Sequence, residues 1–133
     1  MSQIRVLLVD DEADFLRTLG KRLTHRGLAV ATAGGGEECL DILGKAPMDV
    51  VVLDVKMPGM DGIETLAAIN ERHPGTAVVL LTGHADVGMA VSGIEAGAFD
   101  YLMKPVGIDE LVYAIEDAHR ARRLAPSGEG RRT

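Results

Sequence analysis

Five polar residues in this sequence each follow a short apolar segment. The carboxylates are Asp10, Asp11 and Asp54, the hydroxyl belongs to Thr82, and the ammonium belongs to Lys104. If the segments are parallel strands, their carboxyl ends meet at one edge of the sheet, which is where ligands bind in open α/β sheets. We therefore expect the five groups to gather into a single site.

Three crowded carboxylates repel one another. A pair about 5 Å apart repels by roughly 3 kcal/mol at an effective dielectric constant of about 20, and a protein relieves this by raising a pKa or by binding a cation. An all-oxygen ligand set favours Mg²⁺ over zinc, which prefers histidine and cysteine. A carboxylate can also act as a nucleophile and form an aspartyl phosphate. Phosphoryl transfer then needs a metal, a lysine and a hydroxyl donor around the transferred oxygens, and the predicted edge offers residues for each role.

Apolar segments and helical periodicity alternate along the chain. The segments rich in β-branched residues are 4–9, 28–33, 50–53, 77–81 and 99–103. Segments that are apolar on both faces are typical of buried parallel strands covered by helices. Five strands alternating with five helices predict an α/β fold with a doubly wound parallel sheet.

The five predicted helices differ in how clearly they begin and end. The first covers about 12–26 and is stopped by Gly27. Asp61 and Glu64 have the spacing of a capping box at the start of the third, and the last covers about 108–124. The apolar residues that line the helices are, in chain order, Phe15, Leu16, Leu19 and Leu23; Cys39, Leu40 and Leu43; Ile63, Leu66 and Ile69; Val87, Val91 and Ile94; and Leu111, Ile115 and Ala118.

The composition predicts one compact domain. The chain has 133 residues, of which 47% are hydrophobic and 26% charged, and a formal net charge of −6. This acidic balance argues against direct binding of nucleic acid. No apolar run approaches the roughly 20 residues that cross a bilayer, and a single cysteine cannot form an internal disulfide, so we expect a cytoplasmic protein that binds no membrane. We expect the domain to cover 1–124, followed by a flexible tail or the start of a linker at 125–133.

Four sequence blocks resemble the response-regulator receiver domain of two-component signalling. They are LLVDDE at 7–12, LDVKMPGMDG at 53–62, LLTGHAD at 80–86 and GAFDYLMKP at 97–105. The resemblance covers about residues 4–122, and the order and spacing of the four blocks make it specific. It implies a flavodoxin-like sheet with strand order 2-1-3-4-5 and five helices.

The resemblance implies that Asp54 is the phosphoacceptor. The donor would be the phosphohistidine of a sensor histidine kinase or of a phosphotransfer protein. Asp10, Asp11, Asp54 and the backbone carbonyl of Lys56 would hold Mg²⁺. Such a domain is a signalling module rather than an enzyme, since it catalyses only its own phosphoryl transfer and dephosphorylation.

The resemblance also implies roles for the remaining site residues and for the partners. Lys104 would pair with the phosphoryl oxygens, and Thr82 and Tyr101 would form the switch. The output surface would comprise the fourth helix, the fifth strand and the fifth helix, and it would act on a downstream effector domain or protein, or form a homodimer on phosphorylation. The stretch 83–91 resembles receivers that are attached to transcription regulators.

Other interpretations of these residues remain open at this point. Asp10 and Asp11 could cap the first helix, Asp54 could be a turn residue, and Lys104 a surface lysine. A phosphatase with an aspartate nucleophile would carry a DxD motif after the first strand, whereas here Asp10 is followed directly by Asp11 and Glu12. A flavin-binding module of the same sheet order would need a Ser/Thr/Gly-rich phosphate loop and aromatic residues, yet this chain is only 3% aromatic and has no tryptophan.

Overall fold

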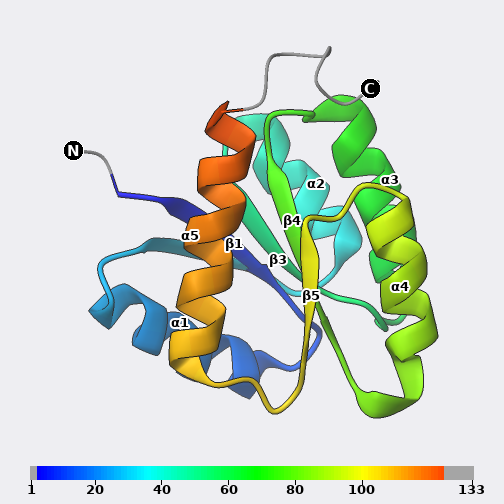
Figure 1. The fold of residues 1–133 in the computed structure, drawn as a ribbon, viewed down its shortest axis with the longest axis horizontal. Helices are drawn as coiled ribbons and strands as arrows, with labels where there is room; N and C mark the ends of the chain where they lie inside the picture. Colours follow the sequence, from blue (N-terminus) through cyan, green and yellow to red (C-terminus); the bar gives the residue numbers. More distant parts are fainter. Residues whose placement is uncertain (1–2, 125–133) are drawn as a thin grey trace.

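The computed structural model describes residues 3–124 of the chain, so the predicted tail at 125–133 lies outside the described residues. The elements, in chain order, are β1 (Arg5–Val9), α1 (Ala13–His25), β2 (Ala29–Ala33), α2 (Gly36–Lys45), β3 (Val50–Asp54), α3 (Gly62–Arg72), β4 (Ala77–Thr82), the short 3₁₀ helix η1 (His84–Asp86), α4 (Val87–Glu95), β5 (Asp100–Met103) and α5 (Ile108–Leu124) (Figure 1). The alternation of strands and helices that the sequence predicts is confirmed.

The five strands form one parallel sheet in the order β2-β1-β3-β4-β5, as expected. Val9 pairs with Leu53, so the residues that follow them, Asp10 and Asp54, reach the same edge of the sheet on neighbouring strands. Thr82 ends β4, the next strand along. The strand order itself therefore collects polar residues from distant parts of the chain at one edge.

Helices cover both faces of the sheet, with α1 and α5 on one face and α2, α3 and α4 on the other (Figure 1). Alternation along β1 shows how the sequence divides between the two layers. Val6 and Leu8 pack toward α1 and α5, whereas Leu7 and Val9 pack toward the other layer, and all four are buried. A strand buried on both faces requires apolar residues at every position, which is the pattern in the sequence.

Local signals set the ends of the helices. Gly27 has a φ of +90°, a conformation that favours glycine, directly after the C-cap of α1. At the start of α3, the Asp61 carboxylate accepts from the backbone N–H of Glu64 at 2.9 Å, and the Glu64 carboxylate accepts from the backbone N–H of Asp61 at 3.0 Å. This reciprocal pair confirms the predicted capping box and fixes the loop that follows Asp54.

The inner face of α4 differs from the sequence prediction. The buried residues of this helix are Ala90 and Gly93, whereas Val91 and Ile94 are exposed. Gly93 sits so close to β4 that an added Cβ would lie 2.4 Å from the side chain of Leu80. Because only small residues allow this approach, the interpretation of Val91 and Ile94 as the packed face is wrong.

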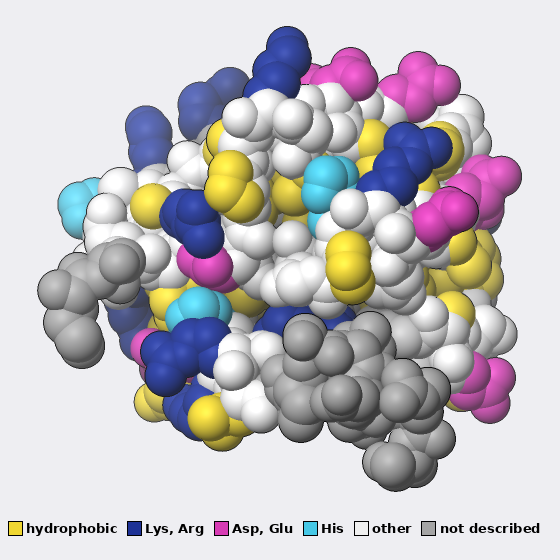
Figure 2. All heavy atoms as spheres, turned by 90° about the horizontal axis from the view of Figure 1, so that it is seen from above, with side chains coloured by type: hydrophobic (Ala, Val, Ile, Leu, Met, Phe, Trp, Pro, Cys, Tyr) yellow, Lys and Arg dark blue, Asp and Glu magenta, His cyan; other side chains and the backbone are white. Residues whose placement is uncertain are grey.

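None of the helices within residues 3–124 is long and apolar enough to cross a membrane. Figure 2 shows the molecule from the end at which α5 finishes, where basic, acidic and histidine side chains are interspersed with hydrophobic ones. The single cysteine, Cys39, is fully buried. Burial raises the pKa of its thiol to about 12, so Cys39 acts as a small apolar filler.

Candidate functional site

Asp10 follows β1 and is held by hydrogen bonds on both of its carboxylate oxygens. Oδ1 accepts from the backbone N–H of Glu12 at 2.9 Å, and Oδ2 accepts from Nζ of Lys104 at 2.7 Å. The residue is 1% exposed. The N-cap of α1 is Glu12 rather than either aspartate, so Asp10 connects the start of α1 to a charged partner instead of capping the helix.

The three predicted carboxylates lie together. Asp10, Asp11 and Asp54 each offer a carboxylate oxygen, and these oxygens lie within 4.8 Å of one another. Asp10 and Asp54 are buried, whereas Asp11 is exposed. An all-oxygen set with one solvent-exposed member fits a hard divalent cation such as Mg²⁺, which retains several water molecules when bound.

The surroundings of Asp54 raise the pKa of its carboxyl to about 6. The largest cause is burial, which disfavours the charged form. Lys104 and a hydrogen bond from the backbone of Lys56 act in the opposite direction, and the negative charges of Asp10 and Asp11 raise the pKa further. The positive charge around the carboxylate therefore does not offset its burial.

Lys104 follows β5 and reaches back across the sheet edge. Its backbone N–H donates to the carbonyl of Thr82 at 2.8 Å, and the peptide bond to Pro105 is cis. Its Nζ lies 3.8 Å from Oδ1 of Asp54 and 4.4 Å from the centre of the Phe15 ring. The ammonium thus stands among two carboxylates and one aromatic ring.

The other predicted site residues surround this cluster. Thr82 is buried, and its hydroxyl donates to the carbonyl of Gly83 at 3.0 Å rather than to a carboxylate. Tyr101 on β5 is half-buried and packs against the layer of α2, α3 and α4. Lys56 is exposed, and its backbone hydrogen bond to Asp54 is its contact with the site.

Two further residues shape the site without having been assigned to it from the sequence. The helical periodicity predicts Phe15 only as part of the apolar face of the first helix, yet its ring lies 4.4 Å from Nζ of Lys104. Gly62, at the start of α3, lies so close to β3 that an added Cβ would be 2.4 Å from the backbone oxygen of Asp54. Phe15 and Lys104 are far apart in the chain, and Gly62 and Asp54 lie on either side of a loop. Residue spacing alone therefore does not predict either contact.

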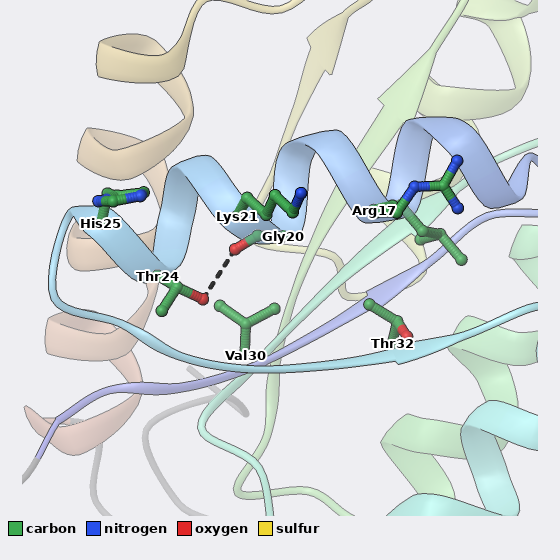
Figure 3. Close-up of a pocket in the computed structure, with 8 residues that line it drawn as sticks. Arg17, Gly20, Lys21, Thr24, His25, Val30 and Thr32 are labelled. Atoms are coloured by element: carbon green, nitrogen blue, oxygen red, sulfur yellow. Dashed lines mark hydrogen bonds between the residues drawn. The ribbon is translucent and has the colours of Figure 1, made fainter.

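A groove of about 390 Å³ lies between α1 and β2 and is separate from this cluster (Figure 3). Arg17, Lys21 and His25 contribute from the helix, and Val30 and Thr32 from the strand. No carboxylate lines this groove. The candidate site is therefore the acidic edge of the sheet.

Comparison with known families gives one decisive match. Residues 6–116 match the family described as the response regulator receiver domain. The chain belongs to this family. The match favours the receiver interpretation over the phosphatase and the flavin-binding module, and it assigns the domain a role in signalling.

Individual relatives and solved structures agree with this assignment. The chain is 43% identical over 111 residues to the DNA-binding transcriptional regulator NtrC of Klebsiella pneumoniae, covering 84% of this chain and 24% of that protein. It is 42% identical to the transcriptional regulatory protein GlrR of Escherichia coli, covering 85% of this chain and 26% of that protein. A receiver-domain crystal structure from Clostridium thermocellum has a TM-score of 0.87 at 36% identity, covering 91% of this chain and 98% of that one. The chain spans about a quarter of the length of the two curated relatives.

Proposed function

We propose that Asp54 accepts a phosphoryl group from the phosphohistidine of a sensor histidine kinase or a phosphotransfer protein. The observation that carries this proposal is the placement of its carboxylate, which lies 3.8 Å from the Lys104 ammonium and within 4.8 Å of oxygens of Asp10 and Asp11. A nucleophile, a cation and a metal-binding acid pair at one point are the groups that phosphoryl transfer requires.

In this proposal, a carboxylate oxygen of Asp54 forms a bond to phosphorus. The P–N bond of the phosphoimidazole breaks, and its electron pair remains on the ring nitrogen, which takes up a proton. Lys104 faces the oxygens of the transferred group and offsets their charge. Mg²⁺, held by Asp10, Asp11, Asp54 and the backbone carbonyl of Lys56, supplies further charge neutralisation when bound. The domain would catalyse this transfer and its own dephosphorylation, and no other reaction.

The modified domain would switch through Thr82 and Tyr101. In the structure the Thr82 hydroxyl donates only to the neighbouring Gly83 carbonyl, a contact that it can exchange for a phosphoryl oxygen. Tyr101 is half-buried on β5, and its ring would turn inward when the hydroxyl moves. Such a switch stabilises an active conformation that is otherwise a minor one.

The output surface in this proposal comprises α4, β5 and α5. Val91, Ile94, Phe99 and Tyr113 are large hydrophobic residues of this region that are exposed. Clusters of exposed hydrophobic side chains favour contact with another protein, and we propose that these residues form such a cluster. We propose that the surface acts on an effector domain or protein, or on a second copy of the domain after phosphorylation.

The relatives suggest what the effector does. NtrC and GlrR are transcriptional regulators, and each is about four times as long as the matched region. We propose that residues 1–124 form the receiver domain of a cytoplasmic regulator of this type. The net charge of −6 agrees with DNA contacts being made by another part of such a regulator rather than by this domain.

The proposal is tested with acetyl phosphate, a small donor that needs no kinase. With Mg²⁺, the wild-type protein should gain one phosphoryl group, seen as a single mass increment by intact-protein mass spectrometry. Asp54→Ala should abolish the increment, and Asp49→Ala, at the other end of the same strand, should retain it. A wild-type protein without the increment, or an Asp54→Ala protein with it, would refute the site.

A further inference from the structure

The ammonium of Lys104 lies over an aromatic ring that has no assigned role in the site. Its Nζ is 4.4 Å from the centre of the Phe15 ring. Phe15 projects from α1 and is half-buried against the core layer of α1 and α5. A cation within about 6 Å of a ring centre is attracted by the negative face of the ring. The Lys104 side chain is 24% exposed, so solvent weakens this attraction only in part.

The other contacts of Lys104 leave its position incompletely fixed. Asp10 accepts a hydrogen bond from Nζ at 2.7 Å, whereas Oδ1 of Asp54 lies 3.8 Å away, beyond hydrogen-bond distance. Lysine has a flexible four-carbon stem and an ammonium that can donate in many directions. The strongest partner, Asp10, therefore does not by itself decide how close the ammonium stays to Asp54.

Phe15 adds a contact from a third element. Asp10 follows β1, Asp54 ends β3, and Phe15 stands on the first turn of α1. The backbone N–H of Glu12, the N-cap of this helix, donates to Oδ1 of Asp10, so the start of α1 is tied to the same acid cluster. The helical turn that carries the ring is thus tied to the carboxylates.

We propose that Phe15 is a positioning residue for phosphoryl transfer, and that its ring holds the Lys104 ammonium beside the Asp54 carboxylate. This inference rests on the proposed function and deepens it. In this inference the ring acts only through the lysine, whose ammonium it contacts. Its contribution should therefore depend on the positive charge of Lys104.

The experiment measures initial rates of phosphorylation by acetyl phosphate at saturating Mg²⁺. Phe15→Leu keeps an apolar side chain of similar size but removes the ring, and Phe15→Tyr keeps the ring. Ile4→Val is the control, because Ile4 is also a partly buried hydrophobic residue packed against the layer of α1 and α5, but it precedes β1, at the end of that strand away from Asp10. Acetyl phosphate needs no docking partner, so loss of a kinase contact on α1 cannot explain the result.

A double-mutant cycle separates positioning from a general structural effect. Phe15→Leu should lower the rate about three- to tenfold when Lys104 is present, the range expected for a partly exposed cation–π contact. In a Lys104→Met background, which keeps the stem and removes the charge, the same change should have no effect. Phe15→Tyr should stay within about twofold of wild type, and Ile4→Val should match wild type.

The outcomes distinguish this inference from the proposed function. A wild-type protein that takes up no phosphoryl group overturns both. A phosphorylated wild type with an unchanged Phe15→Leu rate, or an equal loss in the Lys104→Met background, overturns the role of Phe15 alone. If Phe15→Leu does not fold, proton NMR of the wild type decides, since the ε-methylene protons of Lys104 should be shifted upfield of those of the other lysines by the ring. An unshifted signal overturns the inference.

Discussion

Strand β3 has an aspartate at each end, and the two carboxylates meet opposite surroundings. Asp49 directly precedes the strand and is paired with Arg5, whose backbone N–H donates to Oδ2 at 2.8 Å and whose guanidinium donates to Oδ2 at 3.1 Å and to Oδ1 at 3.0 Å. Burial alone would raise the pKa of Asp49, but the hydrogen bonds and charge of Arg5 outweigh burial and lower the pKa.

Asp54, at the other end of the same strand, is paired less closely within the described residues, since the Lys104 ammonium lies 3.8 Å from its Oδ1. Burial raises the pKa of its carboxyl to about 6, because Lys104 and the Lys56 backbone, which lower the pKa, are opposed by Asp10 and Asp11 and do not offset burial. The Lys104 ammonium is hydrogen-bonded to Asp10 instead. A carboxylate that the chain itself neutralises contributes to structure, whereas one left short of positive charge is prepared to bind a cation or a phosphoryl group.

Substitutions at the two ends of β3 should differ most strongly in their effect on Mg²⁺ affinity. Asp54→Asn should weaken Mg²⁺ binding on the order of a hundredfold, because one carboxylate attracts a divalent ion by a few kcal/mol even at the dielectric constant of water. Asp49→Asn should leave the affinity unchanged. Isothermal titration calorimetry of the two variants checks this, and equal affinities for both would remove the distinction between the ends.

In the absence of metal, the Asp54→Asn and Asp49→Asn substitutions should change the free energy of unfolding in opposite directions. Asp54→Asn should raise the free energy of unfolding by about 2 kcal/mol at pH 8 in the presence of a chelator, because it removes a buried charge whose pKa is about 6. Asp49→Asn should lower it by roughly 0.5–1 kcal/mol, since the acceptor for the Arg5 backbone N–H loses its charge. Urea denaturation measures both values. A destabilised Asp54→Asn protein would contradict the unfavourable burial of this charge.

The dependence of stability on pH should have opposite signs for the two carboxylates. Between pH about 4 and about 6 the folded protein keeps a proton on Asp54 that the unfolded chain has lost, so the contribution of Asp54 to stability decreases as pH rises through this range. The slope reaches at most about 1.4 kcal/mol per pH unit. Asp49, with a lowered pKa, should contribute stability that is lost only as the pH falls below about 4.

Each contribution is obtained by subtracting the unfolding free energy of the Asn variant from that of the wild type, in the presence of a chelator. The Asp54 difference should change over the higher range and the Asp49 difference over the lower one. Differences that change over the same range, or in the same direction, would show that the two carboxylates are not distinguished by their surroundings.

The fold and the members of the acid cluster could be predicted from the sequence. Apolar segments such as 50–53 mark buried strands because strands covered on both faces need apolar residues at every position. The capping box of Asp61 and Glu64 was predictable because it depends on residues three positions apart. The gathering of Asp10, Asp11 and Asp54 followed from placing each at the end of a parallel strand.

The packing of α4 could not be predicted in the same way. Hydrophobicity favoured Val91 and Ile94 as its inner face, yet Ala90 and Gly93 are the buried residues. The helix approaches β4 so closely that size, rather than hydrophobicity, decides which residues fit beneath it. The same packing leaves hydrophobic side chains exposed on the proposed output surface.

By itself, the sequence determined which groups reach the acidic edge of the sheet, since strand and helix patterns are local properties of the chain. Only the tertiary structure decided how these groups affect one another: that Asp49 is neutralised by Arg5, that Asp54 keeps a raised pKa, and that Phe15 lies under Lys104. Charge interactions depend on distance and on exclusion of water. Both are set by contacts between residues far apart in the chain, and residue spacing does not encode them.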